Sequence, residues 1–178
     1  EKEKSKELHS YMRNLKRDFA LSKEEVPQMT GILPYAKAKD QKKTSPNKAD
    51  KKQIYIYFAP WCAHCHQLLK NLGETMSSSF WKKTQLVAVF SENKEMLASF
   101  IEQTHLKKTA PKALEELIML ENSEETEKLY NEKLFLQAVP KIIVTNKEGK
   151  IINFSFAELE PSPEKDLERD VNLILSHF

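Results

Sequence analysis

Residues 53–65 have the sequence QIYIYFAPWCAHC, in which a β-rich run leads directly into two cysteines. The run 53–58 is mostly β-branched and aromatic and ends at Ala59-Pro60, which predicts a buried strand. Residues 63–80 predict a helix, because their apolar side chains share one face: Leu68, Leu69, Leu72, Met76 and Phe80. The two cysteines are therefore expected at the N-terminus of a helix that follows a strand.

The rest of the sheet is predicted from three further β-rich runs, at residues 85–90, 141–145 and 150–156. Pro140 opens the second of these runs, and the turn 146–149 joins it to the third as a hairpin. Strands joined through a helix pair in parallel, whereas hairpin strands are antiparallel. The sequence thus predicts an α/β fold with a mixed four-stranded sheet and helices on both faces.

Between the second strand and Pro140 lies a long segment, 93–137, with helical apolar spacing and no strand signal. We expect it to be a helical insertion, with Pro111 in the first turn of its middle helix. A last helix is expected to start at Pro161-Ser162-Pro163, and the predicted domain spans residues 35–178.

Residues 1–34 are predicted to form an N-terminal arm, helical over 4–20 and irregular over 21–34. The helical part is amphipathic. It either docks on the core or takes part in dimerisation or partner binding.

The composition fits one domain with an insertion and an arm, since the chain has 178 residues. No apolar run approaches the ~18 residues of a membrane span, and the net charge of +2 implies no strongly charged partner. The stretch 35–52 has seven Lys against Asp40 and Asp50, so it is a solvated linker or the surface of a non-catalytic interaction module. It lacks interleaved aromatic residues, so we expect no nucleic-acid partner. Nothing in the sequence suggests a nucleotide, flavin or haem cofactor, and it contains no glycine-rich phosphate loop.

The chain has only two cysteines, Cys62 and Cys65, and both are at one site. A chain cross-linked for stability would scatter its cysteines, so this pair indicates chemistry. The spacing brings the sulfurs within disulfide reach, and a helix N-terminus favours a thiolate. His64 lies between them. When protonated it would stabilise the thiolate and make the disulfide more oxidising; the alternative is a solvated loop histidine without effect.

The run Phe58-Ala59-Pro60-Trp61-Cys62-Ala63-His64-Cys65 resembles the active site of thioredoxins and, more closely, of protein disulfide isomerases. The later run Ala138-Val139-Pro140-Lys141-Ile142-Ile143-Val144 resembles the cis-proline loop of the same superfamily. The resemblance covers about residues 35–178 and implies a thioredoxin-like fold with a helical insertion. It also implies a thiol–disulfide oxidoreductase.

Site residues follow from this resemblance. Cys62 would be the nucleophile and Cys65 the resolving thiol, with His64 tuning the pair. Pro140 would be cis and face the dithiol. The Val139 backbone would pair with an extended substrate peptide, and Trp61 would belong to the same substrate-binding surface.

Val139 before the proline and His64 inside the dithiol also resemble the bacterial periplasmic Dsb oxidoreductases. That implies protein substrates with thiols or disulfides, a separate redox partner and a periplasmic or otherwise exported location. The first residues of the chain have no apolar signal-peptide region. The sequence leaves the direction of electron flow open.

Three positions depart from the family pattern. Ile56 occupies the place, six residues before the first cysteine, where the family often carries a buried acid that relays a proton to the resolving thiol. Lys70 replaces a helix-kinking proline, and Gly73 either loosens the helix or serves packing. The third departure is the length of the insertion.

Metal binding is the main alternative, because Cys62, His64, Cys65 and His66 could offer soft ligands to copper or zinc. Ligands so close in sequence rarely all reach one tetrahedral site. We therefore expect a redox dithiol and no bound metal.

Overall fold

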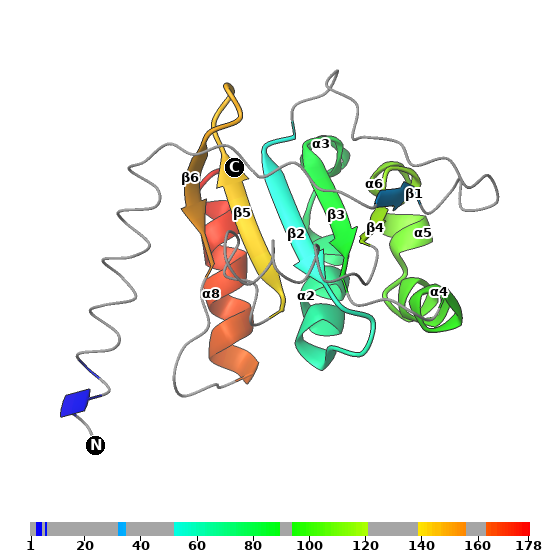
Figure 1. Cartoon of the computed structure of the whole chain (residues 1–178), viewed down its shortest axis with the longest axis horizontal. Helices are drawn as coiled ribbons and strands as arrows, with labels where there is room; N and C mark the ends of the chain where they lie inside the picture. The colour runs from blue at the N-terminus through cyan, green and yellow to red at the C-terminus, as the bar shows by residue number, and fades with distance from the viewer. Residues whose placement is uncertain are drawn as a thin grey trace.

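A mixed six-stranded sheet forms the centre of the computed structural model, which describes residues 3–4, 6, 32–34, 52–89, 94–120, 139–155 and 163–178. The spatial order of the strands is β1-β4-β3-β2-β5-β6 (Figure 1). Their bounds are β1 Ile32–Pro34, β2 Ile54–Phe58, β3 Thr84–Ala88, β4 Ile118–Leu120, β5 Lys141–Thr145 and β6 Ile151–Phe154.

The pairing directions agree with the sequence analysis. The central strands β2 and β3 are parallel, with Ile56 opposite Leu86, and β2 is antiparallel to β5. β5 and β6 form the expected antiparallel hairpin. Asn146 closes its turn, because its side-chain oxygen accepts hydrogen bonds from the N–H groups of Glu148 and Lys150 at 3.0 and 2.9 Å. Gly149 follows with a φ of 85°, a value that favours glycine.

The described ranges contain six helices: α2 Ala63–Thr75, α3 Ser78–Lys82, α4 Lys94–Gln103, α5 Leu106–Thr109, α6 Pro111–Glu115 and α8 Pro163–Leu175. α2 and α8 pack against each other on one face of the sheet (Figure 1). That helices cover both faces stays a prediction.

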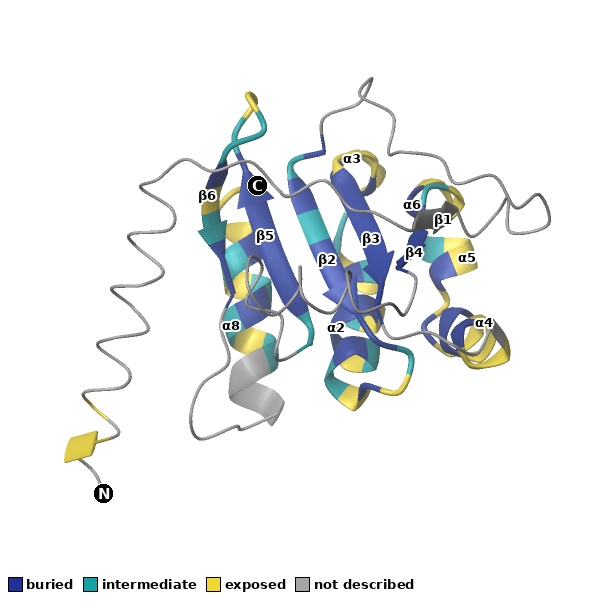
Figure 2. Ribbon diagram, viewed as in Figure 1, coloured by how far each residue is buried: buried dark blue, intermediate teal, exposed yellow. Residues whose placement is uncertain are grey.

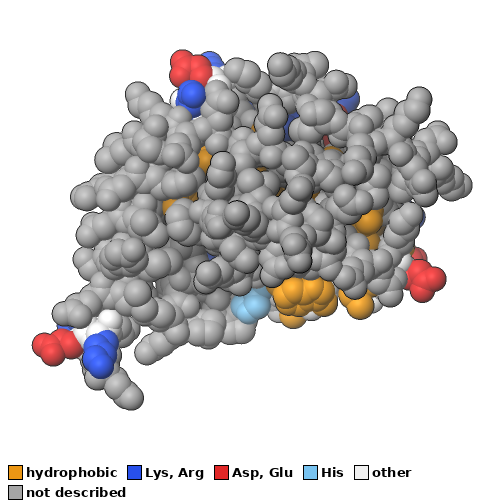
Figure 3. Space-filling model, in the orientation of Figure 1, with side chains coloured by type: hydrophobic (Ala, Val, Ile, Leu, Met, Phe, Trp, Pro, Cys, Tyr) orange, Lys and Arg blue, Asp and Glu red, His pale blue; other side chains and the backbone are white. Residues whose placement is uncertain are grey.

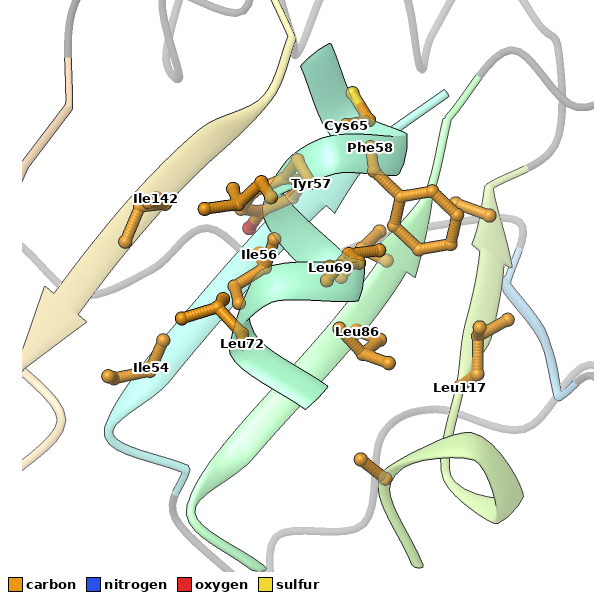
Figure 4. Packing of buried hydrophobic residues seen from close by; sticks show 14 of the residues in the cluster. Ile54, Ile56, Tyr57, Phe58, Cys65, Leu69, Leu72, Leu86, Leu117 and Ile142 are labelled. Carbon is orange, nitrogen blue, oxygen red and sulfur yellow. The ribbon is translucent and has the colours of Figure 1, made fainter. Parts of the chain in front are cut away.

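The core lies between α2 and the central strands. Ile54 and Ile56 of β2 point toward Leu69 and Leu72 of α2 (Figure 4), and all four side chains are fully buried. The central strands are buried along most of their length (Figure 2). Burying each of these side chains stabilises the fold by about 1.5–3 kcal/mol, so the core holds the start of α2 firmly against the end of β2.

Two predicted elements differ from the structure. The single helix expected over 63–80 is two helices, because Met76 and Ser77 adopt extended backbone conformations and turn the chain toward β3. The segment 93–137, expected to lack strands, contains β4, which pairs in parallel with β3. Pro111 does occupy the first turn of a helix, α6, as predicted.

Strand β1 is a further correction, since residues 21–34 were expected to be irregular. Ile32–Pro34 pair antiparallel with β4, which with β4 itself raises the sheet from four strands to six. In the expected arm helix over 4–20 the structure describes only Lys4 and Lys6, both helical. The rest of that helix, residues 35–51 and residues 121–137 lie outside the described residues, so the division into an arm and a domain stays a prediction.

Candidate active site

The first turn of α2 positions the sulfur of Cys62 over the start of the helix. Cys62 is the N-cap residue, with an extended backbone at φ −88° and ψ 112°. Its Sγ accepts a hydrogen bond from the Cys65 N–H at 3.2 Å, and its own N–H donates to the Ala59 carbonyl at 3.1 Å. A sulfur in this place satisfies one of the free N–H groups of the helix N-terminus.

The two thiols are free and unequally exposed. Cys62 is 8% exposed, whereas Cys65, at the inner side of the same turn, is 0% exposed. Only Cys62 can therefore meet a substrate without movement of the helix.

The same geometry lowers the pKa of Cys62 from an ordinary value of 9.0 to about 7. The hydrogen bond from the Cys65 thiol is the largest cause, and the N–H groups of Cys65 and His64 add to it, while burial opposes the shift. Hydrogen bonds to the charged form of a group favour that form. The thiolate, which is the nucleophilic form, is therefore favoured at Cys62 relative to an ordinary cysteine at neutral pH.

Cys65 has the opposite character. Burial raises its pKa far above the ordinary value, and the hydrogen bond to Cys62 and the negative charges of Cys62 and Asp170 raise it further. Cys65 therefore stays a thiol while Cys62 is a thiolate.

The loop before β5 closes over this pair from a distant part of the sequence. The Val139–Pro140 peptide bond is cis, as the resemblance predicts. The Cys62 Sγ lies 3.5 Å from the Val139 carbonyl oxygen, which accepts a hydrogen bond from the thiol. The structure thus brings together Cys62, Cys65, Val139 and Pro140.

The remaining predicted site residues lie around the dithiol. Trp61 is 61% exposed and His64 is half-buried. Exposed hydrophobic side chains gather beside a histidine at one edge of the molecule (Figure 3). Trp61 directly precedes the dithiol and so provides an apolar surface next to it.

His66 lies against α4. Its ring meets the Phe100 ring edge-on at 5.9 Å between centroids, and Phe100 in turn stacks on Phe58 at 5.0 Å. This contact gives His66 a packing role. Across the described ranges, no three His, Cys, Asp or Glu side chains converge as metal ligands would.

Asp170 is a candidate site residue that was not singled out from the sequence. Asp170, on α8, is only 2% exposed, and its charge acts on Cys65. The signal is present in the sequence, because Asp170 lies three residues after Leu167 and four before Ile174, on the apolar face of the predicted helix. Ile56, at the position where the family often has its buried acid, is fully buried and points toward α2 (Figure 4).

No family model and no curated protein matches the sequence. Solved structures do match. The thioredoxin domain of a thiol-disulfide oxidoreductase from Bacteroides vulgatus gives a TM-score of 0.52 at 18% identity, over 85% of this chain and 95% of that one. A thioredoxin-like protein in its oxidized form gives 0.53 at 16% identity, over 87% and 97%.

A thiol:disulfide interchange protein from Bacteroides sp. gives a TM-score of 0.50 at 20% identity, over 84% of this chain and 87% of that one. The chain has the thioredoxin fold, with a Cys-x-x-Cys pair at the N-terminus of the helix after the central strand β2. None of the helices in the described ranges is long and apolar enough to cross a bilayer.

Proposed function

We propose that this chain is a thiol–disulfide oxidoreductase that exchanges disulfides with protein substrates through Cys62 and Cys65. The observation that supports this most is the inequality of the two thiols. The pKa of Cys62 is lowered to about 7, while that of the fully buried Cys65 is raised. A pair used only for packing or cross-linking has no need of one reactive and one protected sulfur.

In the reaction, the Cys62 thiolate attacks one sulfur of a substrate disulfide. A Cys62–substrate bond forms, the substrate S–S bond breaks, and the other substrate sulfur leaves as a thiolate that takes a proton from solvent. Cys65 then loses its proton and attacks the Cys62 sulfur. The Cys62–Cys65 disulfide forms and the second substrate sulfur leaves, so the protein gives up two electrons. The same steps in reverse oxidise a substrate dithiol.

Substrate binding would use Trp61, Val139 and Pro140. Trp61 is exposed beside the dithiol, and the Val139 carbonyl is 3.5 Å from the Cys62 sulfur. A peptide that pairs with the Val139 backbone would therefore carry its own sulfur close to Cys62. His64 would tune the pair. A periplasmic or otherwise exported location, with a separate redox partner that resets the dithiol, belongs to the same proposal.

Two measurements test the assignment of Cys62 as nucleophile. Alkylation of the reduced protein should rise with pH through about 7 and then level off, with the label on Cys62 alone. Cys65→Ser should accumulate mixed disulfides with a protein substrate, whereas Cys62→Ser, the matched control, should accumulate none. Equal alkylation of both thiols at neutral pH would contradict the proposal.

The direction of electron flow follows from a third measurement, the equilibrium of the dithiol with glutathione. A tenfold change in that equilibrium constant corresponds to about 30 mV in reduction potential. A disulfide much more oxidising than glutathione would indicate an oxidase, and a much more reducing one a reductase.

A further inference from the structure

Asp170 is the only buried carboxylate among the residues that the structure describes. It lies on α8, one turn before the fully buried Ile174, on the side of that helix that meets the core. α8 packs against α2, whose inward side chains are Cys65, Leu68, Leu69 and Leu72. A carboxylate in such an apolar interface is unfavourable unless it is paired or has a function.

Part of the charge is compensated on α8 itself. The Nε and Nη2 atoms of Arg169 each donate to the Oδ1 of Asp170 at 3.1 Å, and the Arg169 side chain is 24% exposed. This pairing stabilises an ionised Asp170, which places a negative charge on the helix that packs against α2.

The charge is electrostatically linked to Cys65, whose pKa it helps to raise. If Cys65 simply lost its proton to solvent, two negative charges would face each other in the α2–α8 interface. Like charges in a buried site disfavour double ionisation, so one proton tends to be shared between the two groups.

Other titratable groups on the packed elements are less suited to receive that proton. His66 packs its ring on Phe100, and Tyr57 lies on the β2 face opposite to Ile56 and α2. Cys62 is in the mixed disulfide when Cys65 must ionise. His64 is half-buried at the outer end of the helix.

We propose that Asp170 takes up the proton of Cys65 when Cys65 resolves the mixed disulfide. This inference rests on the proposed function. The Cys65 thiol gives its proton to the Asp170 carboxylate, the Cys65 thiolate attacks the Cys62 sulfur, and the substrate thiolate leaves. The proton transfer leaves the net charge of the interface unchanged, and the negative charge then departs with the substrate thiolate. Asp170 later returns the proton to solvent. The proton passes through one water molecule or after closer approach of the two side chains in the mixed disulfide.

The test separates the two steps with Ellman's reagent, whose coloured thiol is released once when Cys62 attacks and again when Cys65 resolves. Asp170→Asn keeps the size and polarity of the side chain. It should slow the second release at neutral pH at least tenfold, since a positioned general base contributes about 10²–10⁴-fold. The first release should stay within about twofold. The second rate of Asp170→Asn should also rise steadily with pH, because solvent bases replace the carboxylate.

Glu168→Gln is the matched control, because Glu168 is an exposed carboxylate on the same helix and should behave as wild type in both steps. A second release as fast as wild type, or faster, in Asp170→Asn would overturn the proposal, because the charge would then only repel the Cys65 thiolate. Equal slowing of both releases would also overturn it and would indicate a packing role.

A second measurement uses the unmodified protein and so does not depend on the folding of Asp170→Asn. Carbon NMR of the labelled Asp170 carboxyl group should show different titrations in the dithiol and disulfide forms, because coupling between two acids is reciprocal. Identical titrations in the two forms would overturn the proposal. Even then, two normal release steps in the wild type would support the proposed function. The experiments therefore distinguish failure of the Asp170 inference from failure of the proposed function.

Discussion

The reactivity of Cys62 is set by main-chain geometry as well as by neighbouring side chains. The N–H groups of Cys65 and His64 both donate hydrogen bonds that lower the Cys62 pKa. The sequence alone predicts an influence of His64 through its imidazole. The structure adds the backbone of the same residue, so the two contributions need separate tests.

Two substitutions at position 64 separate these contributions. His64→Ala removes the imidazole and keeps the N–H, whereas His64→Pro removes both at a place in the first helical turn where proline is tolerated. If the imidazole acts as predicted, His64→Ala raises the Cys62 pKa. His64→Pro should raise it by about one to two units more, because a hydrogen bond to a charged group is worth about 1.5–3 kcal/mol.

The measurement is the pH dependence of thiolate absorbance in the reduced protein. His66→Ala is the control, since the His66 ring packs on Phe100. If the thiolate of His64→Ala titrates like that of wild type, the imidazole of His64 has no effect on the Cys62 pKa. Equal pKa values for the Ala and Pro variants would show that the N–H contributes nothing.

At the residue scale, the sequence was informative wherever chemistry depends on local spacing. Cys62 and Cys65 are three residues apart, and the Val139-Pro140 pair precedes a hairpin, so both were recognisable in isolation. Asp170 was not, because its influence on Cys65 depends on how α8 packs against α2. A single acidic residue on an apolar helix face is the only local sign of such a role.

At the scale of elements, strong periodic patterns were predicted well and short elements were not. β5 spans Lys141–Thr145 as predicted, and β2 differs from its prediction by one residue. β4 was missed because its three residues continue the helical spacing of Leu114 and Leu117, and only pairing with β3 makes them a strand. Tertiary pairing overrides local propensity for elements this short.

The helix α2 contains Gly73, for which the sequence allowed either a loosened helix or a packing role. α2 continues through Gly73 to Thr75, and α5 approaches it at that point. A Cβ at position 73 would lie 2.6 Å from the Oγ1 of Thr109. The packing explanation is therefore the one that the structure supports.

Gly73→Ala should lower the free energy of unfolding by about 1 kcal/mol. Overpacking against Thr109 costs about 1–3 kcal/mol, and the better helix propensity of alanine returns about 1 kcal/mol. In a Thr109→Ala background the same substitution should be neutral or stabilising. Urea unfolding of the four proteins of this double-mutant cycle measures the coupling. Additive effects would mean that the close approach of α5 does not constrain position 73.

At the scale of the whole molecule, the insertion is part of the fold. β4 extends the sheet beyond β3 and carries β1 at its outer edge. The ion pair between Lys52 and Glu116 also ties the loop before β2 to the end of α6. Sequence periodicity could not reveal this, because strand order depends on contacts between distant segments.

The two thiols also make the stability of the reduced protein depend on pH, in opposite directions on either side of pH 9. The folded state lowers the Cys62 pKa from 9.0 to about 7, so between these values the unfolded chain binds more protons and stability rises with pH. The folded state raises the Cys65 pKa, so above about 9 the unfolded chain loses a proton that the folded protein keeps. Stability then falls as pH rises further.

We therefore expect the free energy of unfolding of the dithiol protein, minus that of Cys62→Ala/Cys65→Ala, to rise from pH 7 and to peak near pH 9. All other titrating groups cancel in this difference to first order. Urea unfolding under reducing, oxygen-free conditions measures it. A difference that stays flat between pH 7 and 9 would contradict the lowered Cys62 pKa, because linkage requires the shift to appear as stability. A plateau above pH 9 in place of the fall would contradict the raised pKa of Cys65, since the buried thiol would then ionise as readily as in the unfolded chain.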